Sequence, residues 1–550
     1  MTGLSEAFER TGSVLEHRMP LMHAPGAALA VTDDDETLGV VVRGFADAAS
    51  SAAVRPETRF EIGSISKSFA AIVAVQEAET GRLDLQAPVN ELVPWLRLRQ
   101  PFGPITLHHL LTHSAGLAIG TEHTGEAVSA SRRRAEVDPG FAPGERFSYS
   151  NDGYKIVGLV LEHTTGTPIA DLLRQRILEP LGMARTSPTI TPEERLDLAT
   201  GYASVFDDRP THREHPLVPA AWTDSTTADG SIISTVLDMG AYARMLIRRG
   251  AGPDGTRILS EEAFHRLTTP YVLDQDDPSW HYAYGFWVGT DPADGRRYIW
   301  HSGGMVGFTA LLMVDVDADL GGVMLVNGDG DRRAVLGFAL AAVRAAVSGA
   351  PLPDPADTPD PLRIEKAEEY VGRYTGLHRT IEIAESHGGL TLRDGDREIP
   401  LEVDTTQVPT DAFLVPHPGL DRFYLRFCRD ADADGAVVAA THGANRFERG
   451  EVAPIDPPLP QEWTAFPGHY RSTNPWNPSL RVVAREGKLW LIAAGVGING
   501  ELELRPDGDD GFVAGLEPWR TERVWFDVVI EGRAARMHFD GAPYHRSFMP

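Results

Sequence analysis

The chain of 550 residues contains a single cysteine, Cys428. One cysteine excludes an internal disulfide and any metal site that is built from several cysteines. Its neighbours, Phe423-Tyr424-Leu425-Arg426-Phe427, favour a buried thiol on a strand as the ordinary interpretation.

The sequence also lacks long apolar runs and an excess of positive charge. No stretch of about 18 apolar residues occurs, and the segment Met1-Thr2-Gly3-Leu4-Ser5-Glu6 has no basic part followed by an apolar part. We therefore expect a soluble, cytoplasmic protein with no membrane partner. The 78 acidic and 51 basic residues give a net charge of −27, which argues against nucleic acid or an anionic membrane surface as a partner.

Lysine is scarce even among the basic residues. Only four of the 51 are lysines, at positions 67, 155, 366 and 488. Where arginine is the usual cation, a lysine that opens an apolar helix suggests a need for an amine that can lose its proton, because arginine cannot supply one. Lys67 occupies such a position.

Lys67 belongs to the stretch Gly63-Ser64-Ile65-Ser66-Lys67-Ser68-Phe69. An alternating segment at 58–62 predicts a short strand before it, and the apolar run at 69–76 predicts a buried helix after it. Ser64 is expected at the helix start, with Lys67 on the same face one turn later. A serine needs a neighbouring base to become a nucleophile, and a partly desolvated lysine can be that base. The alternative for this stretch alone is a helix cap beside a snorkelling lysine.

Tyr149-Ser150-Asn151 is a second candidate feature, because it opens a helix predicted over 153–165. Close to a lysine ammonium, the Tyr149 phenolate becomes accessible, and it could take the Ser64 proton and return it to a leaving group. The amide of Asn151 can hold Lys67 or a substrate carbonyl. Taken singly, Tyr149 could equally pack in a loop.

His301-Ser302-Gly303-Gly304 is the third feature, at the end of an apolar strand. Its glycines would let a substrate backbone approach closely, and the N–H groups of Ser64 and Gly304 would form an oxyanion hole. The alternative is a histidine at a strand end that is followed by a turn. His113, in a loop of small residues, is interpreted as structural rather than as a ligand or a base.

The rest of the first 350 residues alternates between predicted helices and strands. A polar segment at 120–140, with Arg132-Arg133-Arg134, predicts a surface excursion. Helices are expected over 5–23, 168–183 and 332–348, and strands over 27–31, 37–42, 284–288, 298–304, 309–314 and 322–326. The segment 105–117 is expected to begin as a helix with a threonine cap and to end in a loop of small residues.

Proline clusters divide the chain further. Five prolines within 351–361 and four within 454–460 predict two linkers, so we expect domains at 1–350, 362–453 and 461–550. The last two resemble each other, because Tyr370-Val371-Gly372-Arg373-Tyr374 corresponds to Phe466-Pro467-Gly468-His469-Tyr470. They predict a duplicated, lipocalin-like all-β module, a small antiparallel barrel or sandwich with closing strands near Arg446-Phe447 and Ser547-Phe548.

Together the motifs resemble those of the serine β-lactamase and penicillin-binding-protein superfamily, of peptidase S12 type. The similarity is greatest to its class C-like branch of esterases and D-stereospecific aminopeptidases or amidases. The residues that carry it are Ser64-Ile65-Ser66-Lys67, Leu110-Leu111-Thr112-His113-Ser114-Ala115-Gly116-Leu117, Pro143-Gly144, Tyr149-Ser150-Asn151 and His301-Ser302-Gly303.

The resemblance covers about residues 20–345 and has several implications. It implies an α/β domain with a central antiparallel sheet flanked by helices, plus a helical subdomain. It implies Ser64 as the nucleophile and Lys67 and Tyr149 as acid/base partners, without a metal or another cofactor. The substrate-binding residues by the same match are Asn151, His301, Gly303 and Gly304.

One departure from the superfamily narrows the expected substrates. The β-lactamases and most penicillin-binding enzymes carry Lys-Thr/Ser-Gly where this chain has His301-Ser302-Gly303. A histidine is mostly neutral at pH 7, so it offers a substrate one hydrogen bond and little charge. We therefore expect a serine hydrolase that forms an acyl-enzyme on esters or amides without a free carboxylate, including D-amino-acid amides and peptides.

Two alternatives to this function stay open. One is an enzyme of the DD-peptidase or β-lactamase type, and the other is a catalytically inactive homologue that binds a ligand. The expected partner is a small molecule or short peptide as substrate, and a homodimer is left open.

Overall fold

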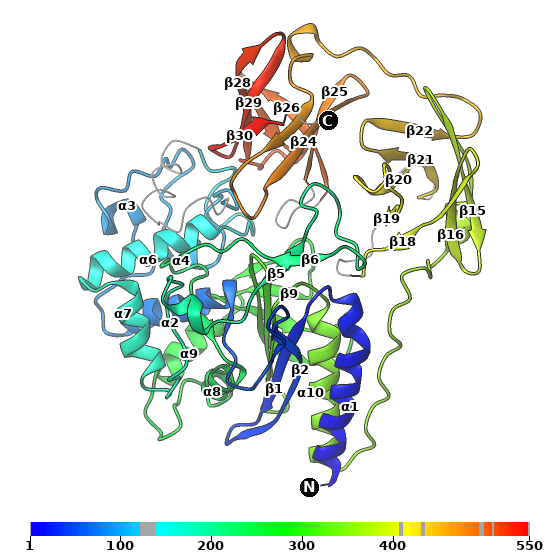
Figure 1. Ribbon diagram of the computed structural model, residues 1–550. Coiled ribbons are helices and arrows are strands. Elements are labelled where there is room, and N and C mark those ends of the chain that lie inside the picture. Colours follow the sequence, from blue (N-terminus) through cyan, green and yellow to red (C-terminus); the bar gives the residue numbers. More distant parts are fainter. Residues whose placement is uncertain are drawn as a thin grey trace. The chain divides into compact units, whose positions relative to one another are not determined.

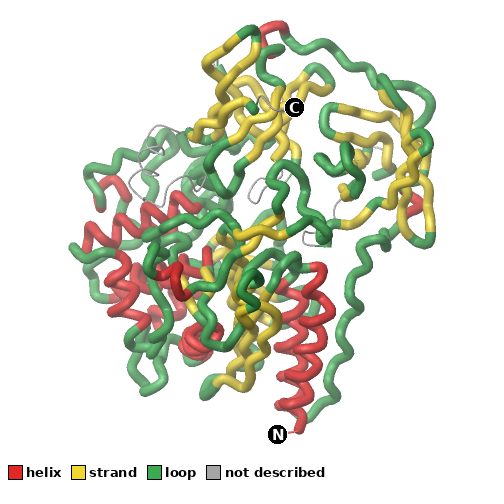
Figure 2. Tube along the Cα trace, in the orientation of Figure 1, coloured by secondary structure: helices red, strands yellow, loops and turns green. Residues whose placement is uncertain are grey.

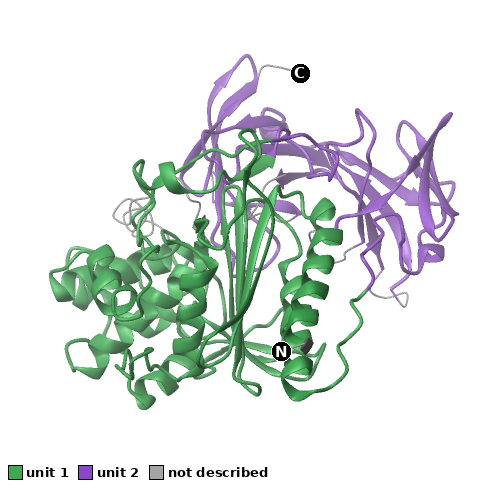
Figure 3. Ribbon diagram, turned by 60° about the horizontal axis from the view of Figure 1, so that its bottom comes forward, with its two compact units in different colours: residues 1–203, 218–356 green, residues 204–217, 357–550 purple. Residues whose placement is uncertain are grey.

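The computed structural model describes residues 2–120, 138–405, 411–430, 435–493, 500–508 and 511–547. Nearly all of the predicted surface excursion at 120–140, as well as Phe548, lies outside the described residues. The chain forms two units, which Figure 3 distinguishes by colour: residues 1–203 with 218–356, and residues 204–217 with 357–550. We call residues 204–217 the crossing segment, because there the chain leaves unit 1 for unit 2 and then returns.

Unit 1 is built on an antiparallel sheet that has nine strands within the described residues. In spatial order these are β3 (Ala52–Ala53), β2 (Thr37–Asp47), β1 (Gly26–Thr32), β13 (Leu320–Val326), β12 (Phe308–Asp315), β11 (Arg297–Met305), β10 (Trp287–Thr290), β9 (Trp280–Tyr282) and β8 (Val272–Leu273). Two smaller pairs are β4 (Phe60–Glu61) with β7 (Ile233–Ser234) and β5 (Tyr202–Ser204) with β6 (Leu217–Pro219).

Both faces of this sheet are covered by helices. Ala28 and Ala30 of β1 belong to one hydrophobic layer, whereas Leu29 and Val31 belong to the other. Because successive side chains of a strand point to opposite faces, an uninterrupted apolar strand requires cover on both sides. Helices α1 (Thr2–Arg18) and α10 (Arg332–Ser348) lie side by side on one face, and the remaining helices gather on the other (Figures 1 and 2).

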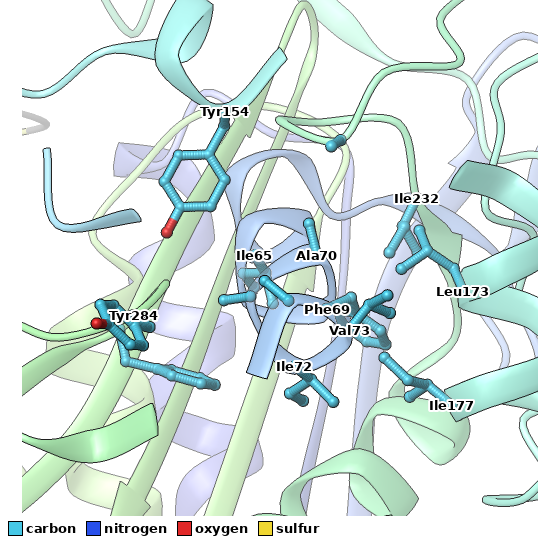
Figure 4. Packing of buried hydrophobic residues seen from close by; sticks show 14 of the residues in the cluster. Ile65, Phe69, Ala70, Ile72, Val73, Tyr154, Leu173, Ile177, Ile232 and Tyr284 are labelled. Carbon is cyan, nitrogen blue, oxygen red and sulfur yellow. The ribbon is translucent and has the colours of Figure 1, made fainter. Parts of the chain in front are cut away.

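The helical layer on the other face surrounds α2, which is apolar on all sides and therefore buried (Figure 4). Its elements are η2 (Gly63–Ile65), α2 (Ser66–Glu79), α3 (Val89–Leu92), α4 (Leu107–Leu111), α6 (Asn151–Thr165), α7 (Ile169–Leu173), η3 (Arg174–Leu178), α8 (Val236–Ile247) and α9 (Glu261–Thr268). Two short helical turns, η1 (Met19–Leu21) and η4 (Glu194–Asp197), lie elsewhere in unit 1.

Most predicted elements of unit 1 are confirmed, and α10 spans the predicted 332–348. The strand predicted over 284–288 is wrong at its start, because β10 begins at Trp287. Gly285 has φ 75°, and the N–H of Ala283 donates a hydrogen bond to the carbonyl of Phe286, so a turn occupies the first residues. The predicted helix over 168–183 is shorter and ends in a π-helical turn, η3.

Unit 2 contains two antiparallel β-modules. The described strands of the first are, in spatial order, β17 (Arg397–Pro400), β16 (Gly389–Asp394), β15 (Thr380–Ser386), β14 (Gly372–Gly376), β22 (Asn445–Arg449), β21 (Val437–His442), β20 (Leu425–Arg429), β19 (Ala412–Leu414) and β18 (Glu402–Val403), preceded by the turn η5 (Ala367–Glu369). The second is a closed barrel of β23 (Gly468–Arg471), β24 (Ser479–Arg485), β25 (Lys488–Ala493), β26 (Glu501–Asp507), β27 (Gly511–Ala514), β28 (Arg523–Ile530), β29 (Arg533–Phe539) and β30 (Ala542–Arg546), preceded by η6 (Gln461–Trp463).

The two modules share one topology. Leu401 alone separates β17 from β18, so the two ends of the first sheet are consecutive in the chain. When β17 and β18 are counted as one interrupted strand, both modules have the same strand order, and the first strand pairs with the last. The predicted central sheet with flanking helices, followed by two all-β modules, is confirmed. The second closing strand, β30, lies slightly before the predicted Ser547-Phe548.

Equivalent side chains hold the first strand of each module. The hydroxyl of Tyr374 donates to the carbonyl of Tyr370 at 2.8 Å, and the hydroxyl of Tyr470 donates to the carbonyl of Phe466 at 2.6 Å. These matching hydrogen bonds, four residues back along the chain in both cases, support a duplication. The thiol of Cys428 lies half-buried on β20, which agrees with the predicted strand but not with full burial.

The crossing segment is bound to the rest of unit 2 by ion pairs. Four of its charged side chains pair with oppositely charged residues of the two modules, in the order Asp207–Arg471, Asp208–Arg481, Arg209–Asp421 and Arg213–Glu402. The pair Arg209–Asp421 is 2.7 Å long, and both side chains are less than one-fifth exposed. The two modules therefore form ion pairs with a segment that is preceded and followed in the chain by residues of unit 1.

Candidate active site

Ser64 lies in the 3-10 turn η2, directly before α2, and its side chain is half-buried. Lys67 lies in the first turn of α2 and is completely buried. The apolar side chains of α2 pack among residues of α7 and η3, such as Leu173 and Ile177, so the helix that carries Lys67 is fixed in the core (Figure 4).

Strand β11 passes directly beside the Ser64 turn, and two glycines permit this approach. Gly63 has φ 53°, and a Cβ there would lie 2.6 Å from the backbone nitrogen of Gly304. A Cβ on Gly303 would lie 1.9 Å from the carbonyl oxygen of Ile62. Larger residues at these positions would move β11 away from the serine. A Cβ on Gly304 would have no neighbour within 4 Å, so open space adjoins the predicted oxyanion position.

The amine of Lys67 is bound by three oxygen atoms of the described residues. Lys67 Nζ lies 2.9 Å from Ser64 Oγ, 2.8 Å from Asn151 Oδ1 and 2.8 Å from the carbonyl oxygen of Asp229. An ammonium group has three N–H donors, so these acceptors saturate it. A buried amine is tolerated here because its N–H groups have oxygen partners.

The same three acceptors determine where the lone pair of a neutral Lys67 amine would point. A neutral amine has two donors and one lone pair. The Asn151 and Asp229 oxygens can only accept, so they keep the two donors. The lone pair is then left for the Ser64 hydroxyl, which can donate its proton. This arrangement suits a general base for serine attack.

Tyr149 lies next to the lysine and is held in place by His113. Lys67 Nζ is 5.0 Å from the centre of the Tyr149 ring, and the His113 ring centre is 4.2 Å from it. The N–H of Ser148 donates to the His113 carbonyl at 2.7 Å, and the N–H of Ser150 donates to His113 Nδ1 at 3.0 Å. His113 therefore binds the backbone on both sides of Tyr149. Burial, assisted by Lys67, holds the pKa of His113 well below its usual value.

His301 is part of the fold rather than an exposed hydrogen-bonding group. Its Nδ1 donates to the carbonyl of Ser302 at 2.6 Å, and its Nε2 accepts from the hydroxyl of Tyr282 at 2.9 Å. This differs from the expected imidazole with one hydrogen bond for a substrate, because the fold uses both ring nitrogens. Burial, with a smaller effect of Lys67, lowers the pKa of His301 to about 3, so the ring is neutral.

Among the described residues there is no group of three or more His, Cys, Asp or Glu side chains with the geometry to hold a metal ion. No helix in the described part of the chain has the length and apolar character needed to cross a membrane.

A serine that is hydrogen-bonded to a buried lysine, beside a Tyr-x-Asn segment, lies within the region that matches the family model "Beta-lactamase", residues 14–346. This chain belongs to the β-lactamase family. The predicted superfamily is thereby confirmed. The chain belongs to the superfamily of serine hydrolases that includes β-lactamases and penicillin-binding proteins.

Similar proteins include penicillin-binding protein 4 of Amycolatopsis lactamdurans, 32% identical over 245 residues, which are 43% of this chain and 63% of that protein. A D-aminopeptidase of Gluconobacter oxydans is 26% identical over 400 residues, 71% of this chain and 70% of that protein. The structure of the octameric penicillin-binding protein homologue from Pyrococcus abyssi has a TM-score of 0.58 and 25% identity, and the match covers 80% of this chain and 99% of that one.

Sequence reasoning missed three residues that complete the site of this β-lactamase-family protein. Asp229 supplies a carbonyl to Lys67, Tyr282 bonds His301, and Lys155 lies buried near Asp229. The scarcity of lysine was a usable signal for Lys155, because it is one of only four in the chain. Asp229 and Tyr282 carry no comparable signal in the sequence.

Proposed function

We propose that this protein is a serine hydrolase that acts through an acyl-enzyme on Ser64. The observation that carries the proposal is the buried Lys67 amine, 2.9 Å from Ser64 Oγ and otherwise bonded to two oxygens that cannot donate. Lys67 and Tyr149 are the acid/base partners in this proposal, and Asn151 keeps the amine aimed at the serine.

In the acylation step, Ser64 Oγ forms a bond to the substrate carbonyl carbon. Its proton passes to Lys67 or, through it, to Tyr149, and the N–H groups of Ser64 and Gly304 stabilise the oxyanion. The bond to the leaving group then breaks, and the leaving alcohol or amine takes the proton. In deacylation, water donates a proton to the same base and attacks the ester, which releases the acid and restores Ser64.

The proposed substrates are esters or amides without a free carboxylate, including D-amino-acid derivatives. A neutral His301 with both ring nitrogens bonded offers no positive charge to such a carboxylate. The relative named D-aminopeptidase supports amides as substrates. Its match spans 400 residues, which is more than the region that matches the family model, residues 14–346. The relative named penicillin-binding protein 4 keeps a DD-peptidase or β-lactamase-type activity as the alternative.

The test combines a fluorophosphonate probe with a substrate panel. We expect the probe to label Ser64 in the wild type and in Ser68→Ala, a matched serine control, but not in Ser64→Ala. The panel contains p-nitrophenyl esters, D- and L-amino-acid p-nitroanilides and nitrocefin. Turnover of the uncharged esters or anilides above nitrocefin supports the proposal. Absence of labelling favours an inactive binding homologue, and preferential hydrolysis of nitrocefin favours the β-lactamase-type alternative.

Oligomer formation is a second, smaller proposal. The Pyrococcus abyssi homologue is described as octameric. We propose that this chain also associates, as the homodimer left open from sequence or as a larger assembly. Light scattering coupled to size-exclusion chromatography distinguishes a monomer, a dimer and a larger oligomer.

A further inference from the structure

Lys155 is a second lysine that is completely buried beside the candidate site. It lies on α6, four residues after Asn151 and therefore one turn further along the helix. Its Nζ is 3.8 Å from Asp152 Oδ1 and 4.0 Å from Asp229 Oδ2. Both carboxylates are also buried, so one ammonium lies between two acids out of contact with solvent.

These two acids are closely connected to the groups that bind Lys67. Asp152 follows Asn151 directly in the chain. Asp229 presents its carbonyl oxygen to Lys67, while its carboxylate accepts from the Thr227 hydroxyl and lies near Lys155. A single residue, Asp229, therefore faces the two lysines with two different groups.

The separation matters for the chemistry of Lys67. A carboxylate in contact with a lysine favours the charged ammonium form, which has no lone pair to accept a proton from serine. Within the described residues, the hydrogen-bond acceptors of Lys67 are a hydroxyl, an amide and a backbone carbonyl, all neutral. The neighbouring carboxylates lie near Lys155 instead.

We infer that Lys155 is a positioning residue: it holds the carboxylates of Asp152 and Asp229 away from Lys67, so that Lys67 keeps neutral partners and can act as the base for Ser64. This inference rests on the proposed function. Lys155 does not touch the substrate; it acts through Asp229 and Asp152 on the protonation of Lys67.

Other titratable groups also face Lys67 and belong to the same pH profile. The rings of Tyr149 and Tyr154 lie 5.0 and 5.8 Å from its Nζ. The Lys67 charge also lowers the pKa of two histidines, His113 and His301, which burial already keeps neutral. These two imidazoles therefore add no charge to the site at neutral pH, whereas the cluster of Lys155 with Asp152 and Asp229 contains two carboxylates and one ammonium.

The test compares variants with opposite expected effects on the acid limb of the kcat/KM–pH profile, measured on a p-nitrophenyl ester with the full chain. Lys155→Met releases the carboxylates, so the acid limb should move to higher pH by about one unit. Asp229→Asn removes one carboxylate but keeps the carbonyl, so the limb should move to lower pH. The triple variant Lys155→Met/Asp152→Asn/Asp229→Asn leaves the cluster without charge, as Asp229→Asn does on balance, so its limb should also lie below that of the wild type and not above it, where Lys155→Met alone places it.

A purely structural role would lower the stability of these variants without moving the acid limb in opposite directions. Unchanged limbs in both folded single variants would overturn the inference. If Lys155→Met does not fold, two other variants test the inference. The acid limb should move to lower pH in Asp229→Asn and should stay in place in Lys155→Arg, which conserves the charge. Probe labelling of Ser64 in the wild type distinguishes a failure of this inference from a failure of the proposed function. If the wild type is labelled and active but the acid limbs of the variants do not move, only the role of Lys155 is contradicted. If the wild type is not labelled, the proposed function is contradicted.

Discussion

The two sides of the candidate site are equally buried, yet they treat charge in opposite ways. On the lysine side, Lys67 and Lys155 lie near hydroxyl, amide, carbonyl and carboxylate oxygens. On the aromatic side, burial keeps His301 neutral and raises the pKa of Tyr282 well above its usual value, so neither ring carries a charge. Tyr149 lies between the two sides, in contact with Lys67 and with the ring of His113.

The two sides differ in how their buried polar groups are satisfied. The Lys67 amine has three oxygen partners, whereas the His301 imidazole has one donor and one acceptor satisfied and stays neutral. The site therefore places the Lys67 amine next to the uncharged rings of His301 and Tyr282. We expect the first side to determine the rate and the second side to determine which substrates are accepted.

The largest effect is expected from Ser64→Ala, which removes the hydroxyl that is hydrogen-bonded to Lys67 and is the proposed nucleophile. Turnover should fall by about three orders of magnitude or more, because no acyl-enzyme can form. The free energy of unfolding should change by at most about 1–2 kcal/mol, as for the loss of a helix-start hydroxyl. Stopped-flow kinetics and denaturant unfolding measure both. Burst kinetics in Ser64→Ala would contradict the assignment.

The next effect concerns the link between the two sides. Lys67→Ala and Tyr149→Phe should each lower kcat by about 10²–10⁴, and the double variant should be far less damaged than the product of the two losses, because they transfer one proton as a unit. Tyr154→Phe is the matched control, since its ring also faces Lys67 but its hydroxyl donates to the carbonyl of Leu111. If the two losses of kcat are additive in the double variant, Lys67 and Tyr149 act independently and do not transfer one proton as a unit.

A charge placed on the aromatic side should alter substrate choice. His301→Lys should move the preference toward carboxylate-bearing substrates by about 1–3 kcal/mol, which is roughly 5- to 160-fold. It should also lower stability, because the bonds to Tyr282 and Ser302 are lost. The ratio of kcat/KM for nitrocefin to that for an uncharged ester measures the change. A wild type that already prefers penicillins would show that this interpretation of position 301 is wrong.

The neutral imidazole of His301 should make stability depend on pH. Its pKa is about 3 in the folded protein and 6.5 without the fold, so the unfolded chain binds the extra proton first. Stability is therefore lost as pH falls from about 6.5 toward 3, at up to about 1.4 kcal/mol per pH unit from this group. In His301→Gln, which cannot titrate, the slope should be shallower by that amount. Unfolding in urea at pH 7, 6 and 5 compares the two, and equal slopes would count against a neutral His301.

The smallest effect is expected for Tyr282→Phe. It removes only the hydroxyl that donates to His301 Nε2, which leaves one buried acceptor unpaired at a cost of about 1–3 kcal/mol of stability. Turnover should change only a few-fold, because the charges of the lysine side are untouched. A loss of activity as large as that of Tyr149→Phe would mean that the aromatic side takes part in proton transfer.

The sequence predicts the parts of the site that depend on short spacings. Ser64 and Lys67 are three residues apart, and Tyr149 and Asn151 open α6, so helical geometry alone brings each pair to one place. The uninterrupted apolar segments likewise predict the central strands, because burial on both faces requires them, and the helical spacing of buried apolar residues predicts α10.

The parts that were missed depend on contacts between distant segments. Asp229 binds Lys67 from 162 residues away, and an aspartate in a loop gives no sign that its carbonyl and its carboxylate serve different lysines. The hydrogen bonds of His301 follow from the position of Tyr282 in the three-dimensional sheet, which the strand pattern does not specify. The crossing segment is equally hidden, since its charges are ordinary until their partners are known.

The crossing segment can form its ion pairs only late in the synthesis of the chain. Unit 1 cannot complete its sheet until β13 has been made, because β1 pairs with it, and the last residue of unit 1 is Ala356. Residues 204–217 leave the ribosome long before Glu402, Asp421, Arg471 and Arg481, and domains generally fold as units in the order of their synthesis. A chain that stops in the proline-rich linker would therefore contain a finished sheet and a charged loop whose four partners were never translated.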